Sequence, residues 1–61
     1  MKECKKCNGV DINTIISNTV IYEGEEAYKE KVQCNNCGSE GSIIEYMNRD
    51  QIIYIGNIQD V

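Results

Sequence analysis

The sequence predicts a small, metal-stapled, mainly β fold: a zinc ribbon in which two Cys-x-x-Cys knuckles secure a three- to four-stranded antiparallel sheet. Its four cysteines form two pairs, Cys4/Cys7 and Cys34/Cys37, with 26 residues between the pairs. The remaining segments are rich in Val, Ile, Thr and Tyr, which are residue types enriched in β-strands. The chain has 61 residues, which is enough for one domain over residues 1–61 but too few to bury a core that is stable without a staple.

Each Cys-x-x-Cys pair predicts half of a tetrahedral site, because a tight turn aims both sulfurs at one point. Such a turn usually needs a left-handed residue after the second cysteine, and the chain has Asn8 followed by Gly9 in one pair and Gly38 in the other. We therefore expect one Zn²⁺ to be bound by Cys4, Cys7, Cys34 and Cys37. A structural zinc contributes roughly 10–16 kcal/mol of apparent binding free energy, so metal binding and folding should be one transition.

The N-terminal sequence favours metal binding over the other uses of paired cysteines, which are structural disulfides and redox-active thiols. Met1-Lys2-Glu3 leads directly into the first pair, so we expect no signal peptide. No apolar run is long enough to cross a bilayer, so we expect no membrane association. These features predict a cytoplasmic protein, in a compartment where thiols stay reduced.

A Cys4 shell also binds a single iron, so a rubredoxin-like electron carrier is an alternative to a zinc protein. Rubredoxins resemble this chain in their paired knuckles, and the resemblance implies an aromatic core and a proline in the second knuckle. The chain has no Phe, Trp or Pro, and its second knuckle reads Cys34-Asn35-Asn36-Cys37. Composition therefore favours zinc over iron.

The segment between the knuckles predicts a β-hairpin. Residues 10–22 are rich in β-formers, and the hairpin turn is expected at residues 23–26, with residues 28–33 returning antiparallel. This hairpin brings Cys7 and Cys34 together, as one shared metal ion requires. The alternating set expected on one face of its first strand is Ile12, Thr14, Ile16, Asn18, Val20 and Tyr22.

The segment after the second knuckle predicts a loop at residues 38–41 and then a choice between strand and helix. Ser42 to Glu45 matches a capping box, which favours a short helix over residues 43–49. We favour a strand, because the Ile-rich segment has little helical periodicity and residues 48–50 form a turn signal before another strand. Residues 51–61 contain five aliphatic side chains and no lysine, so this C-terminal strand is expected to be a sheet edge that pairs with a second copy or a host protein.

Two motifs carry a resemblance to a known family. Cys4-x-x-Cys7-Asn8-Gly9 and Val32-Gln33-Cys34-x-x-Cys37-Gly38-x-x-Gly41 resemble the restriction-alleviation (Lar-type) zinc ribbons of phages and prophages, over residues 1–50. Where that family has Trp-Asn followed by Arg, this chain has Met47-Asn48-Arg49. The Com-type phage translational regulators, which bind RNA, are similar in size and knuckle number. The resemblance implies a phage or mobile-element origin, and hence the cytosol of the host cell.

The charge balance indicates the kind of partner. Six Lys and Arg face ten Asp and Glu, which gives −4, and four thiolates with one Zn²⁺ add −2, so the metal-loaded chain carries about −6. Binding of nucleic acid depends on cations that neutralise phosphates, so this charge disfavours it. The basic cluster Lys2, Lys5 and Lys6 is expected to screen the thiolates instead. An acidic ribbon is better suited to a basic protein surface, such as that of a nucleic-acid enzyme.

Catalysis is not expected. The chain has no His and no Gly-rich phosphate loop, and a complete Cys4 shell leaves zinc no position for water or substrate. The carboxylates of Glu23, Glu25 and Glu26 are expected in a solvated hairpin turn. The sequence thus predicts a non-enzymatic zinc-ribbon module that docks on a host protein, with an RNA- or DNA-binding ribbon regulator as the alternative.

Overall fold

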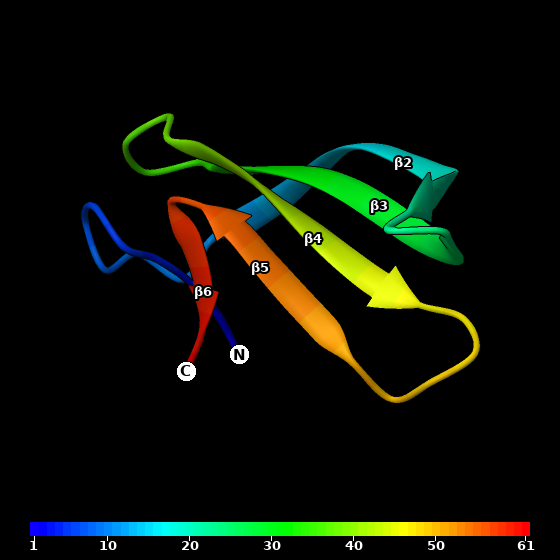
Figure 1. The fold of residues 1–61 in the computed structure, drawn as a ribbon. Coiled ribbons are helices and arrows are strands. Elements are labelled where there is room, and N and C mark those ends of the chain that lie inside the picture. Colours follow the sequence, from blue (N-terminus) through cyan, green and yellow to red (C-terminus); the bar gives the residue numbers. More distant parts are fainter.

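The computed structural model describes all 61 residues. They form six strands, joined by turns and loops, and no helix. Four strands form an antiparallel sheet in the order β2-β3-β4-β5, and the two shortest form a separate antiparallel pair, β1-β6 (Figure 1). The predicted small, mainly β fold is confirmed, and no helix is present that could cross a bilayer. The strands are β1 (Lys2–Cys4), β2 (Ile12–Tyr22), β3 (Glu25–Cys34), β4 (Glu40–Tyr46), β5 (Ile52–Gly56) and β6 (Ile58–Asp60).

The hairpin between β2 and β3 turns more tightly than the sequence predicts. Glu23 and Gly24 both have positive φ, 51° and 81°, and Tyr22 pairs directly with Glu25. Two successive left-handed residues close a two-residue turn of the kind that matches strand twist. The prediction of a turn over residues 23–26 was therefore wrong in its second half, where Glu25 and Glu26 already belong to β3.

A β-bulge in β2 breaks the predicted alternation. Thr14 pairs with Val32 and Ile16 pairs with Lys31, so Ile15 is the extra residue. A bulge shifts every later side chain to the other face of the strand. The predicted single set is therefore wrong: its first two members lie on one face of the sheet, and the members from Ile16 onward lie on the other.

Strand β4 forms the centre of the fold, which settles the choice between strand and helix in favour of strand. Its adjacent residues Ile43 and Ile44 are 5% and 1% exposed, although neighbouring strand residues point to opposite faces. Both faces of the sheet are therefore partly covered. Ile43 belongs to a cluster with Cys4, Val32, Cys34 and Ile58, on what we call the knuckle face.

The opposite face, which we call the open face, has a smaller cluster of Ala27, Ile44 and Tyr46. The ring of Tyr22 meets that of Tyr46 edge to face, with centroids 6.1 Å apart. The guanidinium carbon of Arg49 lies over the Tyr46 ring, 4.2 Å from its centroid. Side chains of the sheet and its loops thus cover this cluster without a second layer of strands.

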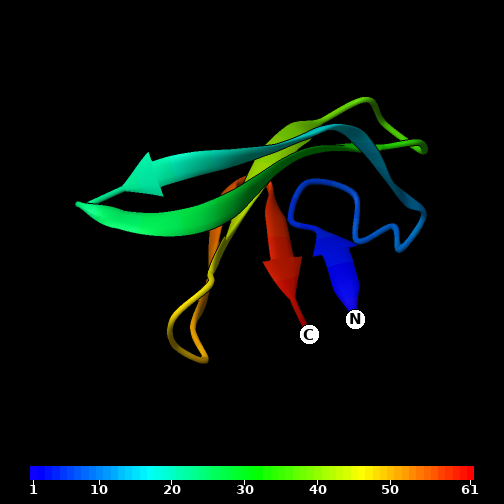
Figure 2. The same cartoon turned by 90° about the vertical axis from the view of Figure 1, so that its right-hand side faces the viewer.

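The pair of β1 and β6 lies against the knuckle face near the metal end, while the β2-β3 hairpin extends beyond it (Figure 2). The sequence predicts one C-terminal strand, and the structure has two. Gly56 has a φ of 84° and ends β5, after which the chain crosses the sheet as β6. Crossing brings Ile58 opposite Cys4 in the β1-β6 register, so the C-terminus secures the first knuckle.

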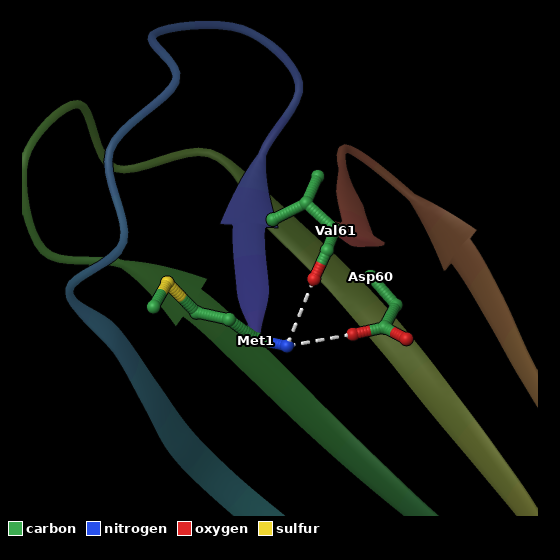
Figure 3. Close-up of polar contacts among 3 residues, drawn as sticks. All are labelled: Met1, Asp60 and Val61. Carbon is green, nitrogen blue, oxygen red and sulfur yellow. Dashed lines mark hydrogen bonds and ion pairs between the residues drawn. The ribbon is translucent and has the colours of Figure 1, made fainter.

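The two chain ends are joined at the outer end of this pair (Figure 3). The Met1 ammonium donates to Asp60 Oδ1 at 2.9 Å and to the Val61 carbonyl at 3.1 Å, and the Val61 N–H donates to the Met1 carbonyl at 2.8 Å. Both partners of the ion pair are well exposed, so it contributes little, about 0–1 kcal/mol. The backbone bonds extend the β1-β6 ladder by one residue.

Candidate metal centre

The two knuckles repeat one pattern of backbone hydrogen bonds around their first cysteines. The Cys4 carbonyl accepts from the Asn8 N–H at 2.9 Å, and the Cys34 carbonyl accepts from the Gly38 N–H at 2.9 Å. In each knuckle the N–H of the first cysteine donates to the carbonyl five residues later, at 2.9 and 2.8 Å. Asn8 and Gly38 have φ of 61° and 81°, so the left-handed positions predicted from sequence are confirmed.

The four cysteine sulfurs converge on one point, with all Sγ atoms within 4.8 Å of one another. Sγ of Cys4 lies 3.5 Å from that of Cys37, and Sγ of Cys7 lies 3.5 Å from that of Cys34, so both close contacts join different knuckles. Four sulfurs at 2.3 Å from a tetrahedral zinc would be about 3.8 Å apart. All four cysteines are free thiols, at separations well beyond the ~2.05 Å of a disulfide bond.

This donor set fits a single tetrahedral metal ion. Thiolates select soft metals, and a tetrahedral set of four suits zinc or iron alike. A metal bound here would join β1 to the end of β3, because each knuckle begins where one of these strands ends.

Burial differs sharply around the cluster. Cys4 and Cys34 are completely buried against Val32 and Ile58, whereas Cys37 is exposed. The first cysteine of each knuckle is therefore part of the hydrophobic core, while the second lies toward solvent. The site lies at the boundary of the core, and solvent reaches one side of it.

Hydrogen-bond donors surround the two outer sulfurs. The side-chain amide of Asn36 at 3.5 Å, followed by the Gly9 N–H at 3.4 Å, lowers the pKa of Cys7. The hydroxyl of Ser39, whose oxygen lies 3.3 Å from Cys37 Sγ, and the Ser39 N–H lower the pKa of Cys37 to about 6. Such donors stabilise negative charge on sulfur, which is the form that binds metal.

The buried sulfur of Cys34 behaves differently. The backbone N–H of Cys37 lowers its pKa, but burial and the neighbouring thiols outweigh this effect and raise the pKa of Cys34 to about 11. Four sulfurs this close cannot all carry charge without a cation among them. The cluster thus contains two sulfurs prepared to ionise and one that requires a bound cation to do so.

Sequence reasoning missed the support that the sulfurs receive from outside the ligand set, and it noted Gly9 only as a turn residue. A Cβ added at Gly9 would lie 3.2 Å from Cys7 Sγ and 3.5 Å from Cys34 Sγ, so this glycine allows the knuckles to meet. Asn36 and Ser39 were not singled out, although polar donors inside and just after a knuckle are a usable signal. Ile58 was noted only as an aliphatic residue, because nothing local predicts that it packs beside Cys4.

The three lysines singled out from sequence differ in their ion pairing. Lys2 Nζ lies 3.9 Å from Glu30 Oε2, so this lysine is paired with a carboxylate across the knuckle face. Lys5 and Lys6 are exposed on the first knuckle and form no ion pair. The expectation that the three lysines screen the thiolates stays a prediction, with Lys2 also paired to Glu30.

The carboxylates near the hairpin turn are not all solvated. Arg49 Nη2 lies 2.9 Å from Glu25 Oε2, and this ion pair links the loop between β4 and β5 to β3. Glu23 and Glu26 are exposed, as the sequence predicts. The expectation for this group was therefore wrong for Glu25, because Arg49 is distant in sequence.

Comparison of the chain with protein-family models, with curated proteins and with solved structures gave no match. The fold and the site therefore define the class on their own: a small all-β protein with four cysteines clustered as in a zinc ribbon.

Proposed function

We propose that the chain is a non-enzymatic zinc-ribbon module that docks on a basic surface of a protein partner. The observation that carries the proposal is the convergence of the four Sγ atoms from two knuckles. Four thiolates complete the tetrahedral shell of zinc, so the metal has no position for water or substrate and serves the fold. The motif resemblance to Lar-type ribbons supports a phage or mobile-element origin and a partner in the host cytosol, such as a nucleic-acid enzyme.

The part of the knuckle face beyond β6 has the composition of a docking surface. Tyr28 pairs with Glu45, and Glu45 pairs with Ile52, so these side chains form one row across three strands. Tyr28 and Ile52 are 47% and 49% exposed, although both are large and partly apolar. Glu26 lies two residues before Tyr28 on the same face. We call Glu26, Tyr28, Glu45 and Ile52 the distal patch.

Charge supports a basic partner for the distal patch. Neither Glu26 nor Glu45 takes part in an ion pair within the chain, and the patch contains no cation. Complementary charge accelerates encounter between proteins, and aromatic residues such as Tyr28 are enriched at interfaces.

Site-directed capture from host lysate tests the docking proposal. Native zinc-loaded protein and the control Asp50→Lys should capture the same partner, whereas Tyr28→Ala and Glu45→Lys should lose it. Asp50→Lys is matched because it makes the same charge change at an exposed loop position outside the patch. Equal capture by all four proteins, each with one bound metal, would remove the distal patch from the proposal.

The alternative function is binding of RNA or DNA, and one observation favours it: Lys5 and Lys6 lie exposed and unpaired on the first knuckle. A gel shift at low salt that weakens steeply as salt rises, and that is lost in Lys5→Glu, would support this alternative. Elemental analysis identifies the metal in the same preparation. Its colour is a second test, since iron thiolate is red and zinc thiolate is colourless.

A further inference from the structure

We propose that the protein forms a twofold-symmetric dimer in which β2 pairs antiparallel with β2 of a second copy, with the axis at Asn18. Strand β2 is an edge strand, because only β3 pairs with it. Its 11 residues span roughly 35 Å at about 3.3 Å per residue. It is the longest strand of the protein.

The composition of this edge is unusual for a monomer. Edge strands in soluble proteins are commonly protected by lysine, proline or inward charges that prevent pairing with another chain. Strand β2 contains no charged residue and no proline, in a chain of which 26% is charged. Its side chains Ile15, Ile16 and Ile21 are 42%, 51% and 69% exposed. The one irregularity of this edge is the bulge at Ile15, so the segment that can accept a regularly paired strand begins at Ile16.

The sequence of the edge is also self-complementary. The regular part of the edge that starts at Ile16 reads Ile-Ser-Asn-Thr-Val over residues 16–20, which is aliphatic, hydroxyl, amide, hydroxyl, aliphatic from either end. An antiparallel pair centred on residue 18 places residue 16 opposite 20 and residue 17 opposite 19. Each side chain therefore meets one of its own chemical type in the other copy, on both faces of the joined sheet.

This register provides favourable contacts. Ile16 would pack on Val20 of the other copy, and this pair occurs twice because the interface is isologous. The two Asn18 side chains would meet at the axis, where each amide can donate to the other. Two acidic chains would thus join through a long strand that contains no charged residue.

A second copy fits this edge better than another protein does, because the self-complementarity belongs to this chain alone. An interface of standard size takes at least about 600 Å² from each copy, which is about 15% of the accessible 3948 Å². The exposed side chains of β2, among them Ile15, Ile16 and Ile21, would supply part of that area. The other edge strand, β5, has five residues and leads directly into β6, so it offers less length. The dimer would leave the distal patch of both copies exposed.

Charge substitutions at the axis test the proposal in zinc-loaded protein. Asn18→Lys and Asn18→Asp each place two like charges opposite one another, so each should raise the dissociation constant of the dimer by about tenfold or more in sedimentation equilibrium. An equimolar mixture of the two variants should restore the dimer, because only a position on the axis meets itself. The matched control Asn48→Lys makes the same change at an exposed position in the loop between β4 and β5, away from β2, and should leave dimerisation unchanged.

Isotope-filtered NMR of mixed labelled and unlabelled native protein provides an independent measurement. Intermolecular contacts between Ile16 and Val20 are expected, and they do not depend on whether a variant folds. One bound zinc per chain confirms that each charge variant is intact. A native protein that is monomeric at millimolar concentration, or a dimer that persists in both Asn18 variants, would overturn the proposal.

Discussion

Gly41 lies where β6 crosses the sheet, and this position has no room for a side chain. A Cβ there would lie 2.7 Å from the Ile55 carbonyl oxygen and 2.8 Å from Ile58 Cγ1. We predict that Gly41→Ala lowers the free energy of unfolding of the zinc-loaded protein by about 1–3 kcal/mol, the usual cost of overpacking. Urea titration measures this change in the free energy of unfolding. Ser42→Ala, the adjacent residue in β4, should change stability by less than about 0.5 kcal/mol, and equal effects of the two variants would contradict this account.

Tyr54 makes stability depend on pH at the alkaline end. Burial raises the pKa of this phenol, and the carboxylates of Asp60, Glu30 and Glu45 raise it further. The folded-state pKa of Tyr54 therefore lies above the unfolded value of about 10. Below about pH 10 the phenol is neutral in both states and its contribution to stability is fully present. As pH rises through the folded-state pKa, that contribution is lost. We predict that Tyr54→Phe loses less stability than native protein between about pH 8 and pH 11.

The control for the alkaline prediction is Tyr28→Phe. It removes the same hydroxyl from a side chain that is 47% exposed, so its alkaline loss should match that of native protein. Urea unfolding of all three proteins at each pH provides the comparison. Parallel pH profiles for the native and Tyr54→Phe proteins would exclude Tyr54 as the source.

At the scale of elements, β6 is the part of the fold that connects the C-terminus to the metal. Ile58 is completely buried and lies opposite Cys4 in the β1-β6 register. We predict that Ile58→Ala costs about 2–5 kcal/mol of stability, as other large-to-small core changes do, and also weakens metal binding because Cys4 loses its support. Competition with a chromophoric chelator measures the affinity.

Ile21→Ala serves as the matched control for Ile58→Ala, because it removes the same atoms from a side chain that is 69% exposed. It should leave the metal affinity of the protein unchanged at concentrations where the chain is monomeric. An Ile58→Ala protein that binds metal as tightly as native protein would show that β6 stabilises the sheet without positioning the first knuckle.

The elements that sequence predicted well are those specified by local chemistry. The knuckles follow from cysteine spacing and from left-handed Asn8 and Gly38, and the hairpin follows from β-formers around Gly24. The bulge at Ile15 depends on how β2 registers with β3, and β6 depends on contacts between opposite ends of the chain. Such features are fixed by tertiary packing and leave little trace in a local pattern.

At the scale of the whole molecule, the core is too small to account for the fold by itself. Only eight residues are buried, in two clusters on opposite faces of the sheet that both include residues of β4, and two of the eight are cysteines of the metal site. The ligand set could be predicted from the sequence because spacing alone specifies it. The support of that set by β6, Gly9 and Ser39 could not, since it comes from residues that approach the sulfurs only after folding.

Removal of the metal should therefore unfold the protein. A zinc bound by four thiolates contributes roughly 10–16 kcal/mol of apparent free energy, which is comparable to or larger than the whole net stability of a small domain, about 5–15 kcal/mol. We predict that excess chelator, under reducing conditions, collapses the amide dispersion of Ile43 and Ile44 in NMR spectra, and that Zn²⁺ restores it. Mg²⁺ is the control, because this hard cation prefers oxygen ligands and should restore nothing. A reduced, metal-free chain that keeps both amides dispersed would show that the two hydrophobic clusters are sufficient for folding. Metal binding by the four thiolates would then add stability without being required for the fold.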